Sequence, residues 1–343
     1  MGSSVTNTAM QPTFVIAGKL NREYILPPLG LPVLDSAGGS VLYAAGGLKV
    51  WNHNAGLIAR VGEDYPRQWL SDMEGRGFDV RGIRVQPQSI DLRSFIAYTD
   101  SNERSQSSPV SHFARREMTF PKSLLGYQDS NASNEDPREP QASSPMAMDV
   151  PQDYRAVTHV HICPLDFTSQ SQLVNLFKGG PNQVVSLDPA PNYMNATFWR
   201  DLRLVLQGVT IFQPSEEEMR ALFWGETNDL WQMAGEISGY GPQIIVIKRG
   251  GHGQFVYDAA GNHRYQIPAY PSRLADPTGV GDAFCGGFLA GFQKTGDPLM
   301  AAVYGSVSAS LKIEGSGPFY PLTVLPGLSD ARLHSLQQLA REI

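Results

Sequence analysis

The sequence predicts an α/β protein with a mainly parallel central sheet covered by helices on both faces. Two observations support this. Short apolar runs rich in β-branched residues alternate with helix-like segments along most of the chain, which is the pattern of a doubly covered parallel sheet. The chain has 343 residues, 41% of them hydrophobic, so it can bury a large core in one large domain or two smaller ones.

The N-terminal part contains strands and helices in alternation. The apolar run 13–18 predicts a buried strand that ends in glycine, and 41–52 follows a Gly-Gly pair and predicts the start of a helix. A second buried strand is expected over 55–62. The amphipathic segment 65–77 stops at glycines, as helices do. The segment 94–100 alternates in polarity, which predicts a half-exposed strand.

The composition changes between Ser101 and Pro151, where Ser, Asn, Pro and Glu predominate. A structureless loop of this length is unusual inside a compact domain. We therefore predict that most of 101–151 is a mobile insertion, with 112–120 as an ordered stretch in its middle.

The strand–helix alternation resumes after the insertion. Strand-like runs, each followed by helix-like sequence, lie at 156–164, 183–191, 208–215 and 243–251. A hairpin is expected over 255–270, and helices over 281–295 and 297–313. In a parallel sheet the ligand crevice lies beyond the carboxyl ends of the strands, so functional groups should gather at ends such as Asp188, Ser215 and Gly250.

Bulk properties exclude several classes of partner. The net charge is −6 and no block of Lys or Arg occurs, which argues against nucleic acid and anionic membrane. No apolar run approaches the roughly 18 residues of a membrane span. The polar N-terminus lacks the apolar middle of a signal peptide, and Cys163 and Cys285 are too few for a disulfide framework. We expect a cytoplasmic protein with a small-molecule substrate.

The most informative stretch is "DPTGVGDAFCGG" at 276–287. The turn Gly279-Val280-Gly281 would aim consecutive backbone N–H groups at one point, beside the positive end of a helix dipole. Such a turn could hold a transferring phosphoryl group, and Asp282 could take a proton from an attacking hydroxyl. Alternatively, Asp282 merely caps the helix and the glycines merely shape the turn.

This stretch resembles the C-terminal signature of the ribokinase (PfkB) family of carbohydrate kinases. Other segments resemble family motifs in the same order, and the likeness covers essentially the whole chain apart from the insertion. These segments are 17–26, 37–64 with its Gly-Gly pair, 213–222 and "IKRGGHG" at 247–253. The resemblance implies a ribokinase-like three-layer α/β/α fold in one domain over 1–343, with a small β lid whose strands fall within about 19–35 and 91–120.

The resemblance also implies roles for individual residues. Asp282 would be the base, and Gly279, Val280 and Gly281 would form the anion hole. Glu218 would orient water bound to Mg²⁺. The residues implied to bind ATP are Lys248, Gly250, Gly253 and Ser306. Those implied to face the acceptor are Asn21, Glu23, Gly38, Gly39 and Tyr43. Asp276 and Thr278 stand where some family members bind a monovalent cation such as K⁺, and ribokinase-like lids often pair in a homodimer.

Several positions depart from the family pattern. Glu23 replaces the usual Asp of Asn-x-Asp, while Ser40 and Tyr43 replace the usual sugar-contacting Lys and Asn. Ser215 replaces the Asn of Asn-x-x-Glu, which keeps the acid but loses the amide. These changes argue against ribose itself. The sequence thus predicts an ATP- and Mg²⁺-dependent kinase of a sugar or a cyclic polyol such as an inositol. The alternatives are a nucleoside kinase and a catalytically silent ligand-binding member of the family.

Overall fold

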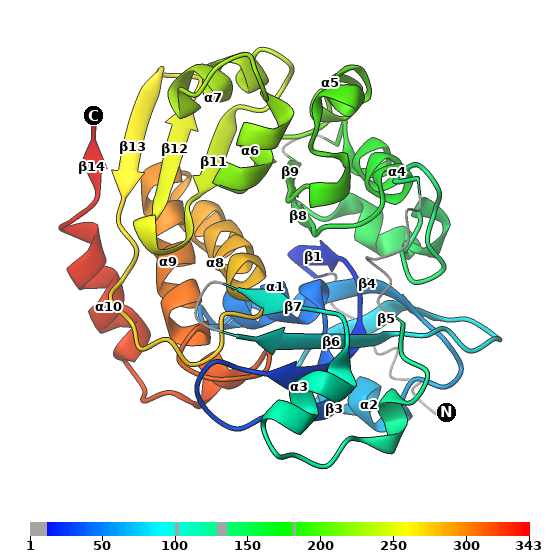
Figure 1. Ribbon diagram of the computed structural model, residues 1–343. Helices are drawn as coiled ribbons and strands as arrows, with labels where there is room; N and C mark the ends of the chain where they lie inside the picture. The colour runs from blue at the N-terminus through cyan, green and yellow to red at the C-terminus, as the bar shows by residue number, and fades with distance from the viewer. Residues whose placement is uncertain (1–11, 100–102, 129–135, 181–182) are drawn as a thin grey trace, which may run out of the picture.

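A ten-stranded sheet runs through the centre of the computed structural model, between two layers of helices, and a separate four-stranded sheet lies beside it (Figure 1). The structure describes residues 12–99, 103–128, 136–180 and 183–343. This arrangement confirms the predicted α/β class with a mainly parallel central sheet.

The large sheet is parallel over most of its width. From one edge to the other its strands are β14 (Arg341–Glu342), β13 (His263–Ile267), β12 (Gln254–Asp258), β11 (Ile244–Lys248), β10 (Ile211–Phe212), β9 (Val184–Leu187), β8 (His159–Ile162), β1 (Phe14–Ala17), β4 (Ala55–Val61) and β5 (Asp79–Val85). All neighbours from β11 to β5 pair in parallel, whereas β11 to β14 pair antiparallel. The predicted hairpin over 255–270 is therefore present as β12 and β13.

Helices cover both faces of this sheet because successive residues of its strands point to opposite sides. In β1, Val15 and Ala17 pack into one core, and Phe14 and Ile16 pack into the other. The first face carries α4 (Phe167–Phe177), α5 (Trp199–Leu206), α6 (Glu216–Leu222) and α7 (Leu230–Ser238). The second carries α1 (Ser40–Lys49), α2 (Arg67–Gly75), α8 (Val280–Thr295), α9 (Pro298–Lys312) and α10 (Leu328–Gln337).

The small sheet contains the strands β3 (Val33–Gly38), β2 (Asn21–Leu26), β6 (Arg93–Tyr98) and β7 (Arg104–Ser105), in that spatial order. Tyr24, Leu26 and Phe95 lie on one of its faces, where the helix α3 (Pro109–Arg115) and the short turn η1 (Lys122–Leu124) cover them. Ile25, Ile96 and Tyr98 form a separate cluster with Val33. We call this unit the lid sheet.

The described residues of 101–151 form short elements that contact both sheets. The first part supplies β7, α3 and η1 to the lid sheet. The second part contains η2 (Ala147–Asp149), and Asp149 accepts a hydrogen bond of 2.6 Å from Arg60 Nε in β4. Val150 is buried in the core of the large sheet. The insertion is thus divided between the two sheets, and its mobility stays a prediction.

The remaining described elements are single turns, namely η3 (Gln152–Ala156), η4 (Pro191–Tyr193), η5 (Ala196–Phe198), η6 (Gly250–His252) and η7 (Tyr320–Thr323). Within the described ranges, none of the helices has the length and apolar character needed to cross a bilayer.

Candidate active site

The site is built around the first turn of α8. Gly279 precedes the helix with φ 70°, a left-handed conformation that glycine adopts without strain. A Cβ atom at this position would lie 2.1 Å from the ring of Tyr43, so glycine is also required for space. Val280 and Gly281 follow and line a cavity, and Asp282 lies within the first turn of the helix. The sequence placed these four residues in one turn, as the structure shows.

Asp282 is a half-buried carboxylate in an acidic environment. Burial first, and then the charges of Asp188 and Glu23, together raise its pKa to about 8, although the ammonium of Lys248 opposes the shift. Asp282 therefore holds a proton far more tightly than an exposed aspartate, and its pKa lies close to neutral pH.

The partly exposed Lys248 and the buried Asp188 form an ion pair near Asp282. Lys248 ends β11 and Asp188 follows β9, so the pair lies at the carboxyl edge of the parallel strands, with 2.6 Å between Lys248 Nζ and Asp188 Oδ2. Cys285 Sγ donates to the same carboxylate oxygen at 3.5 Å. Burial lowers the pKa of Lys248, but the neighbouring acidic groups, Asp188 first, outweigh it and leave this pKa raised.

The sequence predicted only that Asp188 lies at the end of a strand. Its contacts with Lys248 and Cys285 could not be predicted, because these residues are distant in the chain. Its partners lie in β11 and α8, 60 and 97 residues further along the chain.

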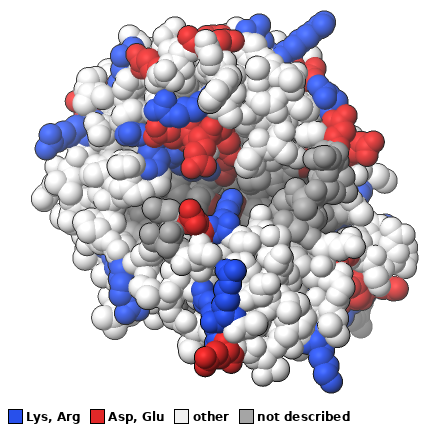
Figure 2. All heavy atoms as spheres, in the orientation of Figure 1, with Lys and Arg blue, Asp and Glu red and all other residues white. Residues whose placement is uncertain are grey.

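A cavity of about 1180 Å³ extends from this turn between α6, η6 and α9. All four residues predicted to bind ATP line it, namely Lys248, Gly250, Gly253 and Ser306. Gly253 has φ +80°, and a Cβ there would lie 2.0 Å from the carbonyl oxygen of Ile267. The face shown in Figure 2 is hollowed near its centre, with acidic and basic side chains beside the hollow. In the wall of the cavity, Arg249 Nε pairs with Glu216 Oε2 at 2.8 Å.

Glu218 forms hydrogen bonds with Ser215 at the start of α6. The backbone N–H of Ser215 donates to Glu218 Oε2 at 2.6 Å, and the N–H of Glu218 donates to Ser215 Oγ at 3.2 Å, which makes a reciprocal capping box. Ser215 is thus the N-cap of α6, at the position where the resemblance leads one to expect Asn. Burial and the charge of Asp188 raise the pKa of Glu218. Within the described residues, no group of three or more His, Cys, Asp or Glu side chains is arranged to hold a metal.

Among the residues predicted to face the acceptor, Glu23 is buried and both of its carboxylate oxygens are hydrogen-bonded. The N–H of Gly39 donates to Oε1 at 2.8 Å, and the hydroxyl of Tyr43 donates to Oε2 at 2.7 Å. A Cβ at Gly38 would lie 2.0 Å from the carboxyl carbon of Glu23, so this glycine makes room for the longer acid. Burial raises the pKa of Glu23 to about 7, although both hydrogen bonds oppose the shift.

The other predicted acceptor residues differ in exposure. Asn21 is half-buried at the start of β2, where its backbone pairs with Gly38. Tyr43 is only 2% exposed, with its ring against Gly279 and its hydroxyl on Glu23. Tyr43 therefore lies behind Glu23, and its ring has no open face for a base or a sugar.

The lid sheet contacts the turn before α8. Tyr98 and Thr278 share a hydrogen bond of 3.0 Å between their hydroxyl oxygens. Asp276 Oδ1 accepts from the N–H of Thr278 at 2.9 Å. The predicted cation pair is thus adjacent, and the buried Lys312 reaches the same place, a contact that the sequence does not indicate.

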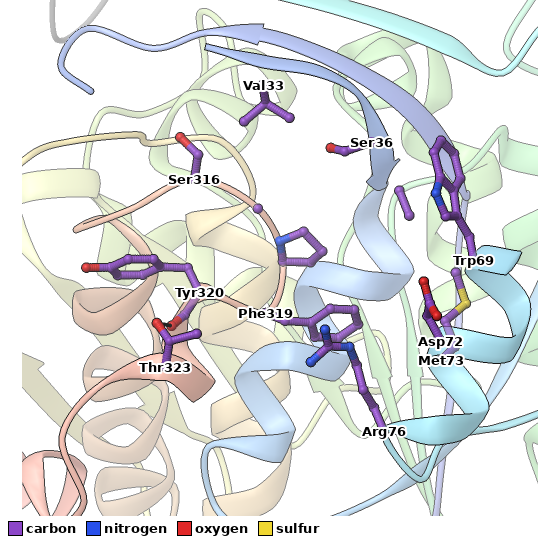
Figure 3. Close-up of a pocket in the computed structure, with 13 residues that line it drawn as sticks. Val33, Ser36, Trp69, Asp72, Met73, Arg76, Ser316, Phe319, Tyr320 and Thr323 are labelled. Carbon is purple, nitrogen blue, oxygen red and sulfur yellow. Dashed lines mark hydrogen bonds between the residues drawn. The ribbon is translucent and has the colours of Figure 1, made fainter. Parts of the chain in front are cut away.

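A second hollow, of about 460 Å³, lies between β3, α2 and the segment 316–323 (Figure 3). The guanidinium of Arg76 lies 4.6 Å from the centre of the Phe319 ring in its wall. Among the described residues that line it, none belongs to the predicted site.

Comparison with solved structures defines the class of fold. An E. coli protein assigned as a ribokinase II, solved in complex with ATP and Mg²⁺, superposes with a TM-score of 0.68 at 21% identity, covering 94% of this chain and 98% of that chain. The protein is therefore a ribokinase-like α/β protein.

Comparison with sequences finds similar kinases. Residues 175–324 match the family model of the pfkB family carbohydrate kinases. The cytidine kinase of Thermococcus kodakarensis is 29% identical over 295 residues, which cover 84% of this chain and 91% of that protein. The ATP-dependent ribose-1-phosphate kinase of Halopiger xanaduensis is 25% identical over 310 residues, covering 86% and 90%. Over residues 175–324 the chain is thus similar to the pfkB family carbohydrate kinases, and both of these longer relatives are named as kinases.

Proposed function

We propose that the chain is an ATP-dependent kinase that transfers the γ-phosphoryl group to a hydroxyl of a small polyhydroxylated acceptor, with Asp282 as the base. The observation that carries this proposal is the position of Asp282. It follows a Gly-Val-Gly turn that lines the large cavity, and it is close enough to Lys248 and Glu23 for both charges to change its pKa.

The environment of Asp282 suits proton transfer at neutral pH. A general base is most effective when its pKa lies near the working pH, and a pKa of about 8 meets this condition. The N–H groups of the turn Gly279-Val280-Gly281, at the N-terminal end of α8, would stabilise the charge on the transferring phosphoryl group. The proton of the acceptor hydroxyl passes to Asp282 as its oxygen bonds to phosphorus, and ADP leaves on the opposite side.

The cavity fits ATP with Mg²⁺. It offers the cation of Lys248 and the glycines of η6, which leave backbone N–H groups accessible to phosphates, and Ser306 lines it further along. Bound Mg²⁺ neutralises phosphate charge. We assign the orientation of its water ligands to Glu218 and Asp188, the acids whose charges interact with each other and with Lys248 beside the cavity.

For the acceptor, we propose a ribosyl compound, with a nucleoside as the first candidate. Two relatives aligned over more than four fifths of this chain are named for cytidine and for ribose 1-phosphate, whereas a fructokinase from Salmonella typhimurium aligns over 80% of it at 24% identity. Tyr43 gives no support to a stacked base, because its ring is buried. A free sugar or a cyclic polyol such as an inositol is the second candidate, since the cluster around Glu23 can bind hydroxyl groups of any of these.

The test is ADP release from Mg-ATP with nucleosides, ribose 1-phosphate, free sugars and inositols as acceptors. One class should be turned over, and Asp282→Asn should lower kcat by about 10²–10⁴-fold, the usual contribution of a positioned base. Binding of a non-hydrolysable ATP analogue should be retained in this variant.

Asp330→Asn is the matched control, because Asp330 is an exposed acid in the first turn of α10. It should keep full activity. Unchanged turnover in Asp282→Asn would refute the assigned base. A chain that binds ATP but phosphorylates none of these acceptors would favour the silent ligand-binding alternative.

A further inference from the structure

Lys312 is a buried cation at the end of α9. Its side chain is 0% exposed. Its ammonium donates to the carbonyl oxygens of Gly315 at 2.9 Å and Asp276 at 3.2 Å, and it lies 3.8 Å from Asp276 Oδ2. It also lies 5.3 Å from the centre of the Tyr43 ring. The charge is therefore surrounded by two carbonyls, a carboxylate and an aromatic face.

This set of groups is one that would suit a bound monovalent cation. Asp276 Oδ2 is buried and accepts no hydrogen bond within the described part of the chain, so the ammonium is the charge that compensates it. Burial lowers the pKa of Lys312, whereas the carboxylates of Asp276 and Glu23 favour its charged form. A K⁺ ion bound to the carbonyl oxygen of Asp276 would lie almost in contact with the ammonium, and the two positive charges would repel each other. The residues present therefore do not fit a K⁺ ion.

We propose that the Lys312 ammonium takes the place of a monovalent cation behind the turn 276–279, so that this protein works without K⁺. The Lys312 ammonium donates a hydrogen bond to the carbonyl oxygen of Asp276 and pairs with its carboxylate. The same carboxylate accepts a hydrogen bond from the N–H of Thr278. Gly279 and the rest of the anion-binding turn follow directly. Lys312 is thus a positioning residue, which fixes the turn without touching the reacting atoms.

The first experiment uses the unmodified protein. Its thermal midpoint and its kcat are compared in KCl and in N-methylglucamine chloride at matched ionic strength. Both should be the same in the two salts. A clear gain in midpoint or in kcat with K⁺ would overturn the proposal.

The second experiment opens the site by Lys312→Ala, with Lys294→Ala as the control. Lys294 is an exposed lysine on α8. Lys312→Ala should lower the midpoint and lower kcat by about 10²-fold, as expected when a catalytic turn is misplaced. K⁺ or NH₄⁺ should restore part of both, and Rb⁺ soaked into crystals should give an anomalous peak beside Asp276 in this variant alone. Lys294→Ala should show neither loss nor rescue.

Two further results would count against the proposal: a Rb⁺ peak beside Asp276 in the unmodified protein, or a Lys312→Ala variant that folds with unchanged midpoint and kcat. If the variant fails to fold, the salt comparison on the unmodified protein decides alone. The measurements of kcat rest on the proposed kinase function. The midpoints and the Rb⁺ peak do not, so failure of one hypothesis can be distinguished from failure of the other.

Discussion

Asp282 and Glu23 bring two carboxyl groups with raised pKa values into one small site, at about 8 and about 7. Each is raised first by burial, and the charge of Glu23 adds to the shift of Asp282. A carboxyl group that ionises beside another acid lowers the stability of the folded state. The arrangement is therefore expected to serve proton transfer and not the stability of the protein.

At the residue scale we predict that Asp282→Asn stabilises the ligand-free protein as pH rises. The pKa of Asp282 is higher in the folded state than its ordinary value of 3.8, so the folded state holds the proton more tightly. The resulting stability is complete below the unfolded pKa and is lost as pH rises through about 8. An uncharged amide at this position does not titrate, so the variant does not lose this stability as the pH rises. The thermal midpoint of the variant should exceed that of the unmodified protein by about 2–4 °C at alkaline pH, and by less near pH 5.

Asp330→Asn, which removes an exposed acid, should change the midpoint equally at all pH values. A difference between Asp282→Asn and the unmodified protein that is constant with pH would contradict the raised pKa. Activity and stability should therefore respond to this substitution in opposite directions.

The residue scale also shows what a single sequence can reveal. Gly279 to Asp282 are neighbours in the chain, so a local pattern could place them. The ion pair of Lys248 with Asp188 and the contact of Lys312 with Asp276 join residues 60 and 36 positions apart. Nothing in either local sequence marks such a contact. The resemblance assigned both Tyr43 and Glu23 to the acceptor, whereas the burial of Tyr43 depends on packing against Gly279, which no local pattern indicates.

At the element scale, α1 and α8 cross at very close range through glycines. A Cβ at Gly286 would lie 1.9 Å from the carbonyl oxygen of Ala44, and one at Gly47 would lie 2.0 Å from that of Ala283. The crossing lies one turn beyond Asp282 and fixes the start of α8 against the helix that carries Tyr43. Glycines in a helix are compatible with such close packing, but a single sequence does not indicate which helix is the partner.

We predict opposite effects for two Gly→Ala substitutions in helices. Gly286→Ala should lower the free energy of unfolding by about 1–3 kcal/mol, because the added methyl group must force α1 and α8 apart. Gly235→Ala in α7 should raise it by about 0.4–1 kcal/mol, since nothing lies within 4 Å of its Cβ position and alanine restricts the unfolded chain. Urea unfolding midpoints measure both. Equal midpoints for the two variants would show that a methyl group at position 286 fits between α1 and α8 without forcing them apart.

Elements were predicted most successfully where their signal is local. Buried strands such as β1 and β4 and the long helices α8 and α9 follow from apolar runs and periodicity. The segment 101–151 has a polar composition that predicts a loop, yet its described residues supply β7 and α3 to the lid sheet and Val150 to the main core. A few apolar residues, Phe113 and Leu124 among them, determine this packing, and average composition conceals them.

At the scale of the whole molecule, the lid sheet determines how copies of the chain could associate. One of its faces is covered within the same chain by α3 (Figure 1). There Phe113 and Leu124 pack against Tyr24 and Phe95. On the other side, Tyr98 bonds to Thr278 beside the active-site turn. Pairing of two lids face to face would have to displace α3 or break this contact.

We therefore predict that the protein is a monomer in solution. Light scattering coupled to size-exclusion chromatography should give a mass near 37.5 kDa at micromolar concentration, with and without substrates.

Loosening α3, which covers one face of the lid sheet, should change the oligomeric state. Phe113→Asp would bury a charge against Tyr24 and Phe95, loosen α3 and expose apolar surface on the lid, so this variant should self-associate. Val110→Asp, at an exposed position of the same helix, should remain monomeric. A dimeric unmodified protein would contradict the prediction. The free strands at the edges of the lid sheet, β3 and β7, would then be the surfaces through which two lids pair, since an edge strand keeps unpaired backbone groups that a second chain can use.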